Sequence, residues 1–212
     1  FSLGMIAYNR MELVSLVHPY LTEMAEKSGE TCHASILDDG MHVMFIDRVL
    51  STSFLKMDTA IGFMPIAGTG KAILAFQSEQ AVNQYIRRAE FKPVTAQSIK
   101  DAQSLLRTLD EIRSKGYACD NEEAELGLTC YAMPLLDSSG HAYAAISISG
   151  PTTRMEQIAQ ALEPSKQRRV EDITHDNLRL DIVTLIFKSS PFGELLNINN
   201  SQKFDNFTAI VC

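Results

Sequence analysis

Apolar and polar positions alternate most clearly between residues 116 and 150. An apolar run from Tyr131 to Leu136 ends at the sequence DSSG, residues 137–140, and an alternating run follows from Ala142 to Ile148. Two such runs joined by turn-forming residues are typical of a β-hairpin. The pattern therefore predicts two antiparallel strands, which the chain enters through an acidic loop that begins at Asp120.

The second strand of this hairpin carries two hydroxyl groups on one face. Side chains of successive strand residues point to opposite faces of a sheet. Ser147 and Ser149 therefore share one face, and Ile146 and Ile148 share the other. The serine face either lines a ligand pocket or is a half-exposed sheet edge.

Helical spacing is clearest in the N-terminal part of the chain. Apolar residues recur at this spacing from Leu13 to Met24 and predict an amphipathic helix that ends near Ser28 and Gly29. Pro19 lies inside this pattern. It would kink the helix or mark its first turn, because proline lacks a backbone donor.

A second hairpin is predicted after this helix. Two apolar runs, Cys32 to Leu37 and Val43 to Val49, flank the turn sequence DDG at residues 38–40. A third strand is predicted from Ser53 to Met57. The glycine-rich sequence GTGK at residues 68–71 then opens a short apolar helix.

Further helices are predicted on either side of the central hairpin. Ser78 is a suitable N-cap for a helix that the region of Pro93 ends. A clear helix runs from Asp101 to Lys115 and stops at Gly116, and a final helix starts at about Met155. Hairpins interspersed with helices predict an α+β fold in which helices flank an antiparallel sheet.

Composition narrows the class of protein. The chain has 212 residues, of which 45% are hydrophobic, as in a globular protein with a core. Its formal net charge of -7 argues against nucleic-acid binding by this chain alone, because clustered Lys and Arg supply that affinity. No apolar stretch reaches the length of a membrane span, about 18 residues, and no signal peptide is recognisable. We expect a cytoplasmic protein and, because the chain starts at Phe1 rather than Met, a fragment of a longer one.

The cysteines do not indicate catalysis or metal binding. There are four, without a CxxC pair, which is typical of free thiols in a reducing compartment. Cys130 begins a predicted strand, where a nucleophile would need a neighbouring base, and His33, His42 and His141 are the candidates. We interpret Cys130 as a packed or pocket-lining thiol, and we predict no catalytic residue, no metal and no cofactor.

Two other motifs have a possible chemical interpretation. A phosphate loop requires Ser or Thr after GK, whereas Ala72 follows Lys71 here, so we do not predict a nucleotide site. The N–H groups of this glycine turn could instead bind a short anion, or the glycines could serve only the turn and the helix cap. The acidic residues of loop 120–125 are interpreted as solvated, because closely spaced carboxylates usually face water.

The donors and acceptors on these segments suit a binding site for a small polar metabolite. They lie among apolar neighbours, without an evident pairing of a nucleophile and a base. The predicted lining residues are Gly68, Thr69, Asp120, Leu128, Cys130, Ser147 and Ser149.

Several motifs together resemble one protein family. They are GETCH at residues 29–33, GTGKAILAF at 68–76, GYACDNEEAELGLTC at 116–130 and AAISISG at 144–150. In this order, from about Leu16 to Thr174, the chain resembles the effector-binding domain of the IclR family of bacterial transcriptional regulators.

The resemblance implies a GAF/PAS-like sensor domain of the α+β class. It implies that a small carboxylate, such as a sugar-derived or aromatic acid, binds at the seven residues named above. Asp120 would accept a hydrogen bond from a hydroxyl or protonated group, while the glycine turn and the two serines would hold the carboxylate. It further implies homodimers or homotetramers, no membrane contact, and DNA binding only through an N-terminal winged helix-turn-helix domain that this sequence lacks.

The resemblance also divides the chain into parts. Residues 1–15 would be a linker and the end of the winged helix-turn-helix domain, which the sequence FSLG at residues 1–4 resembles. Residues 16–174 would be the effector-binding domain, and residues 175–212 a tail unlike the family. The predicted function is ligand sensing and oligomerisation in a transcriptional regulator such as a repressor. The alternatives are a small-acid hydrolase that uses Cys130 and an assembly domain without a ligand.

Overall fold

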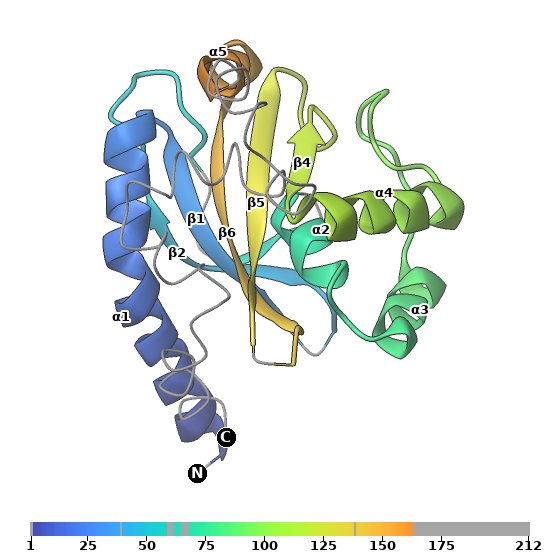
Figure 1. Ribbon diagram of the computed structural model, residues 1–212. Coiled ribbons are helices and arrows are strands. Elements are labelled where there is room, and N and C mark those ends of the chain that lie inside the picture. Colours follow the sequence, from blue (N-terminus) through green and yellow to red (C-terminus); the bar gives the residue numbers. More distant parts are fainter. Residues whose placement is uncertain (1, 39, 59–61, 65–67, 138, 163–212) are drawn as a thin grey trace, which may run out of the picture.

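The computed structural model describes residues 2–38, 40–58, 62–64, 68–137 and 139–162 (Figure 1). It confirms the predicted α+β fold with an antiparallel sheet and flanking helices. The helices are α1 Ser2–Ser28, α2 Gly68–Leu74, α3 Glu79–Arg88, α4 Ala102–Lys115 and α5 Thr152–Leu162. The strands are β1 Thr31–Leu37, β2 Val43–Val49, β3 Gly62–Met64, β4 Ala118–Asn121, β5 Leu128–Leu136 and β6 Ala142–Pro151.

The sheet has six strands in the order β3-β2-β1-β6-β5-β4, and neighbouring strands are antiparallel. Both predicted hairpins are present, as β1–β2 and β5–β6. The pairing of β1 with β6 joins them at the centre of the sheet, where Cys32 lies opposite Ile148. The two central strands therefore come from distant parts of the sequence.

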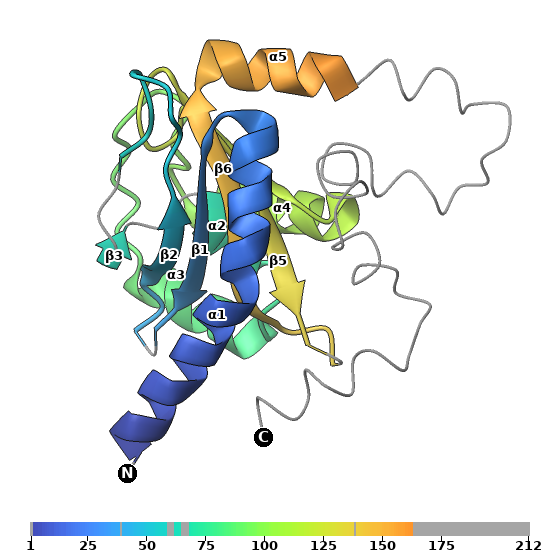
Figure 2. The same cartoon turned by 90° about the vertical axis from the view of Figure 1, so that its left-hand side faces the viewer.

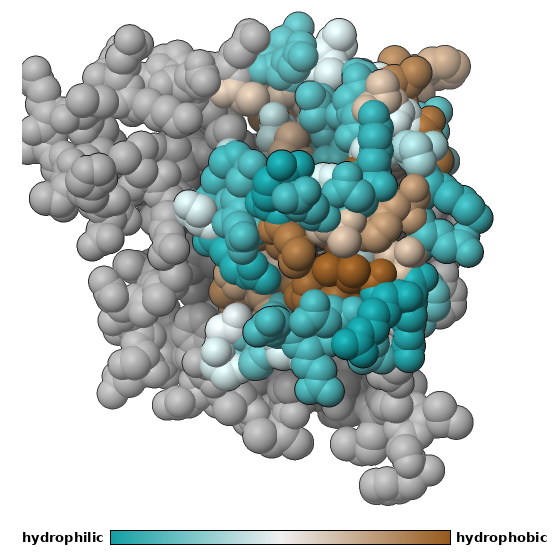
Figure 3. Space-filling model, turned by 90° about the vertical axis from the view of Figure 1, so that its right-hand side faces the viewer, coloured by the Kyte–Doolittle hydropathy of each residue, from teal (hydrophilic) through white to brown (hydrophobic). Residues whose placement is uncertain are grey.

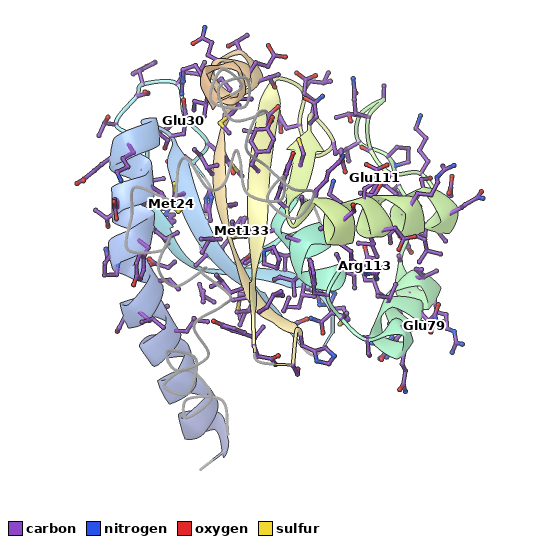
Figure 4. All side chains as sticks on the ribbon, viewed as in Figure 1. Met24, Glu30, Glu79, Glu111, Arg113 and Met133 are labelled. Atoms are coloured by element: carbon purple, nitrogen blue, oxygen red, sulfur yellow. The ribbon has the colours of Figure 1, made fainter. Side chains whose placement is uncertain are left out.

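Helices cover both faces of the sheet. α1 lies along one face, α2 and α4 lie on the other with α3 beside them, and α5 crosses one end (Figures 1 and 2). On the α1 side, Leu21 and Met24 pack with Ile146 and Ile148 in one buried cluster. Met133 of β5 packs against the same cluster, and Figure 4 labels it together with Met24. No helix in the described residues is both long and apolar enough to cross a membrane.

A second buried cluster lies between the sheet and the helices of the other face. Ile73 and Leu74 of α2 pack there with Leu105 and Leu109 of α4 and with Ala145 of β6. Seen from this side, the surface shows a band of hydrophobic residues bordered by hydrophilic ones (Figure 3). α2 is the helix of this layer with the closest contacts to the middle of the sheet, because it lies directly over β5 and β6.

Local signals predicted the start of α3 and the end of α4 correctly, whereas α3 ends at Arg88, before the region of Pro93. Asp101 caps α4, since its Oδ1 accepts a hydrogen bond of 2.7 Å from the backbone N–H of Ser104. Gly116 ends α4 in the left-handed conformation, with a φ of 82°. Ser78 caps α3 by accepting a hydrogen bond from the N–H of Ala81.

α1 is longer than the sequence pattern predicted. It starts at Ser2, continues through Pro19 and ends at Ser28, after which Gly29 has a φ of 72°. Pro19 is exposed, so its ring faces solvent. The helix tolerates the loss of the one backbone hydrogen bond that proline cannot donate. The predicted boundary between residues 15 and 16 falls inside this helix. The domain boundaries stay predictions, and the tail 175–212 lies outside the described residues.

The third strand predicted from Ser53 to Met57 is wrong. These residues belong to a loop, and the strand that pairs with β2 on its outer side is β3. Phe54 and Leu55 suggested a strand, but their relative exposures are 106% and 66%, so neither side chain packs. The N–H of Ser53 donates to Ser51 Oγ at 3.0 Å, a local hydrogen bond of the kind that competes with strand pairing.

The docking of α1 on the sheet gives a stability prediction. Leu21 is fully buried against the sheet, so we expect Leu21→Ala to lower the free energy of unfolding by about 3 kcal/mol through lost burial and a residual cavity. Urea denaturation would measure the change. Leu106→Ala is the control, because Leu106 is exposed on α4. Equal effects of the two substitutions would contradict this packing of α1.

Candidate functional site

A line of polar side chains crosses four neighbouring strands on the face that α2 covers. Asp120 of β4 is opposite Cys130 of β5, Cys130 is opposite Ser149 of β6, and Ser149 is opposite Thr31 of β1. Residues directly opposite each other in antiparallel strands place their side chains on the same face. All four are buried. We call these four residues the polar row.

A second line lies one step further along the same face. Ser147 of β6 is opposite Ala132 of β5 on one side and His33 of β1 on the other. His33 is fully buried, and its ring stacks on Phe45 with centroids 4.5 Å apart. The two serines predicted to share a face therefore do so, in adjacent lines.

α2 approaches the polar row closely because its first residue is glycine. A Cβ atom at Gly68 would lie 2.9 Å from Cys130 Sγ and 3.4 Å from Asp120 Cβ, too close to the sulfur for any other residue. Thr69 is buried next to Gly68. Leu128 is partly buried at the start of β5, two residues before Cys130 and so on the same face.

The structure thus gathers the seven predicted lining residues on one side of the sheet. Gly68 lies against Asp120 and Cys130, and Ser149 is opposite Cys130. Ser147 and Leu128 lie two residues along the same strands, and Thr69 follows Gly68. That these residues bind a ligand stays a prediction.

One carboxylate oxygen of Asp120 already accepts a hydrogen bond from the protein. Its Oδ1 accepts a hydrogen bond of 2.8 Å from the N–H of Glu123, which holds the start of the acidic loop. Glu122 between them has a φ of 60°, so the loop turns sharply here. Within the described residues no hydrogen bond reaches Asp120 Oδ2. That oxygen can accept a proton donor from a ligand.

Lys71 of α2 also binds the acidic loop. Its ammonium group is almost fully buried, donates to the carbonyl oxygen of Cys119 at 2.9 Å and forms an ion pair with Glu123. Burial raises the pKa of Glu123, and the neighbouring Lys71 opposes that rise. The lysine of GTGK is therefore engaged by the protein, in agreement with the prediction that this motif is not a phosphate loop.

Two hydroxyl groups also hold the backbone of the acidic loop by hydrogen bonds. Thr95 Oγ1 donates to the carbonyl oxygen of Glu122 at 2.7 Å, and Ser98 Oγ donates to that of Glu123 at 2.7 Å. Glu125 is exposed, as predicted for a solvated acidic loop. The prediction is wrong for Asp120, which is buried, and for Glu123, whose carboxylate is paired with a buried lysine. One sequence signal was available, namely a single lysine in the otherwise apolar segment GTGKAILAF.

The chemistry of Cys130 does not suit a nucleophile. Burial raises its pKa to about 12, with a smaller opposing effect from the Ser149 hydroxyl, so the thiol is protonated at neutral pH. Burial also lowers the pKa of His33 to about 4, and Arg48 adds to the effect. In the described part of the chain, no hydrogen bond joins Cys130 to a histidine, and no three Cys, His, Asp or Glu side chains form a group that could hold a metal ion.

Known proteins match most of the chain. The family model described as "Bacterial transcriptional regulator IclR C-terminal" matches residues 5–174. A relative named transcriptional repressor IclR, from Escherichia coli K12, is 36% identical over 159 residues, which are 73% of this chain and 58% of the relative. This chain therefore spans less than two thirds of the length of that relative.

Solved structures match the fold. The crystal structure of Thermotoga maritima IclR is 30% identical, with a TM-score of 0.64 over 77% of this chain and 71% of that one. An IclR homologue from Microbacterium hydrocarbonoxydans, solved in complex with 4-hydroxybenzoate, is 19% identical. It covers 72% of this chain and 65% of its own with a TM-score of 0.61. The second likeness shows the fold alone.

The buried pair of Lys71 and Glu123 gives a prediction about stability. Lys71→Met leaves a partly buried carboxylate without its partner, so we expect the free energy of unfolding to fall by about 3 kcal/mol. In the double variant with Glu123→Gln no charge remains, so the loss should be smaller than the sum of the two single losses. Urea denaturation of the four proteins measures this coupling. Strictly additive losses would contradict it, and Lys115→Met, at an exposed ion pair, is the control.

The low pKa of His33 predicts a pH dependence of stability. The unfolded state binds a proton below about pH 6.5, whereas folded His33 stays neutral down to about pH 4. The contribution of His33 to the free energy of unfolding is therefore complete above pH 6.5 and falls by about 3 kcal/mol as the pH is lowered to 4. Denaturation at several pH values should show a shallower slope in His33→Gln than in the wild type. His141→Gln, which removes an exposed imidazole, should keep the wild-type slope.

Proposed function

The chain belongs to the IclR family of bacterial transcriptional regulators, and we propose that it senses a small organic acid that binds at the polar row. The observation that carries this proposal is the close approach of Gly68 to Asp120 and Cys130, with Ser149 beside them. A turn without a side chain thus lies over buried groups that can form hydrogen bonds. Sites for small ligands combine a few such polar groups with apolar walls, here Leu128.

The charges around the row support a particular orientation of the acid. Lys71 is paired with Glu123 and Arg48 with Asp58, so each of these two cations already has a carboxylate partner. Asp120 would repel a carboxylate and attract a hydroxyl or protonated group. The carboxylate of the ligand is therefore placed at the serine hydroxyls and the glycine turn. Sugar-derived acids and hydroxy acids, which carry both groups, fit this arrangement. The 4-hydroxybenzoate bound by the homologue of the same fold is a hydroxy acid.

The hydrolase alternative is not supported. The matched relatives carry the names of transcriptional regulators, and the domain is that of a regulator rather than an enzyme. The protonated thiol of Cys130 agrees with this. A hydrolase would have to consume the acid, whereas a sensor binds and releases it unchanged.

For the whole protein, we propose that the acid changes DNA binding in the cytoplasm. The DNA would be bound by a winged helix-turn-helix domain outside this sequence, in a homodimer or homotetramer. The acid must have different affinities for at least two arrangements of the subunits, since a ligand that binds them equally shifts nothing. An assembly domain without a ligand remains the alternative.

Calorimetric titration with acetate, pyruvate, gluconate and 4-hydroxybenzoate tests the proposal. We expect saturable binding of at least one acid to the 212-residue chain, and binding weakened by about tenfold or more in the double variant Asp120→Ala, Ser149→Ala, which removes two polar contacts. Ser139→Ala, in the exposed β5–β6 turn, should bind as the wild type does. Equal affinity of the double variant and the wild type would refute the site, and conversion of the acid would favour the hydrolase.

A further inference from the structure

An ion pair between buried Glu30 and half-buried Arg154 joins the start of β1 to α5. Arg154, in the first turn of α5, donates from Nε and Nη2 to the two carboxylate oxygens of Glu30, with a distance of 2.8 Å between Nη2 and Oε2. Glu30 is 2% exposed, and Figure 4 shows it at one end of the sheet. A Cβ atom at Gly150 would lie 2.7 Å from Glu30 Cδ, so the pair fits only beside a glycine. A bidentate pair of this kind fixes the orientation of the guanidinium group relative to the carboxylate.

Arg154 also holds the loop between β2 and β3. Its Nη2 donates to the carbonyl oxygen of Leu55 at 2.7 Å. Leu55 and Phe54 form the tip of loop 51–58, and both side chains are exposed. Burial of apolar side chains therefore does not fix this tip. Hydrogen bonds do, among them the one that Arg154 donates to Leu55.

The two ends of loop 51–58 are bound by a residue of the polar row. Thr31 Oγ1 accepts a hydrogen bond of 3.1 Å from the N–H of Ser51 and donates one of 2.9 Å to the carbonyl oxygen of Met57. Thr31 is directly opposite Ser149 in the row. The loop thus lies against the β1 end of the row, and a displacement of the loop would pull on the Thr31 hydroxyl.

We propose that Arg154, oriented by Glu30, is a positioning residue for the ligand site. It fixes loop 51–58 against the β1 end of the polar row and thereby sets how long a bound acid is retained. This inference rests on the proposed function. Lysine cannot replace arginine here, because its single nitrogen cannot reproduce the fixed planar placement of Nε and Nη2, which donate to both carboxylate oxygens of Glu30 and to the Leu55 carbonyl.

Arg154→Lys tests the inference, with Arg113→Lys as a matched control. Arg113 also donates to a backbone oxygen, that of Ala75 at 2.6 Å, and pairs with a carboxylate, that of Asp110, but on α4 (Figure 4). Amide hydrogen exchange, recorded without a ligand, measures how often loop 51–58 opens. We expect amides of residues 51–58 to exchange about tenfold faster in Arg154→Lys and at the wild-type rate in Arg113→Lys.

Stopped-flow titration with the same four acids measures retention. For any acid that binds the wild type, we expect dissociation to be about tenfold faster in Arg154→Lys, association nearly unchanged, and both rates unchanged in the control. Glu30→Gln, which weakens the pair from its other side, should repeat this pattern. A merely structural role would instead lower the melting temperature without changing the dissociation rate.

The outcomes separate this inference from the proposed function. If the wild type binds none of the acids, the proposed function fails, and loop exchange alone decides the role of Arg154. Unchanged exchange of residues 51–58 in both Arg154→Lys and Glu30→Gln overturns the inference. Faster exchange with an unchanged dissociation rate overturns it as well, while the ligand site itself would stand.

Discussion

The alternation of side chains along β6 is the constraint on which the rest of the structure depends. β6 is hydrogen bonded to β1 and β5, and both of its faces are buried. Ile146 and Ile148 complete the core under α1, while Ser147 and Ser149 face α2. A shift of one residue would bury both hydroxyls in the apolar core and place both isoleucines beside Asp120 and Cys130. The docking of α1 and the polar row are therefore fixed by the same register.

Two ion pairs, each with one buried and one half-buried partner, support the two ends of the polar row. Lys71 and Glu123 hold the acidic loop next to Asp120, and Glu30 and Arg154 hold loop 51–58 next to Thr31. The desolvation cost of burying such charges offsets much of their attraction, so these pairs are weak evidence for stability. Their geometry points to a different role. Each fixes a loop that borders one end residue of the row.

The sequence allowed local features to be predicted well, because they depend on spacing and on a few capping residues. The hairpin β5–β6, the caps Ser78 and Gly116, and the common face of the two serines are of this kind. The strand assigned to Ser53–Met57 failed, because an apolar pair does not reveal whether a neighbouring strand is available. The partners of Lys71 and Glu30 could not be predicted from spacing, since Glu123 and Arg154 are distant in sequence. Strand alternation and turn chemistry suggested the seven lining residues, and the family resemblance then implied the same positions.

The order of strands has a consequence for how the chain folds. The hairpins β1–β2 and β5–β6 each pair neighbouring segments and need only short loops to close. The pairing of β1 with β6 spans most of the described chain, and such long-range contacts form slowly because the intervening chain must first be ordered. Cys130 and Ser149 belong to one hairpin, and Thr31 belongs to the other. The polar row is therefore completed only when the two halves of the sheet join, so a newly synthesised chain gains its complete polar row late in folding.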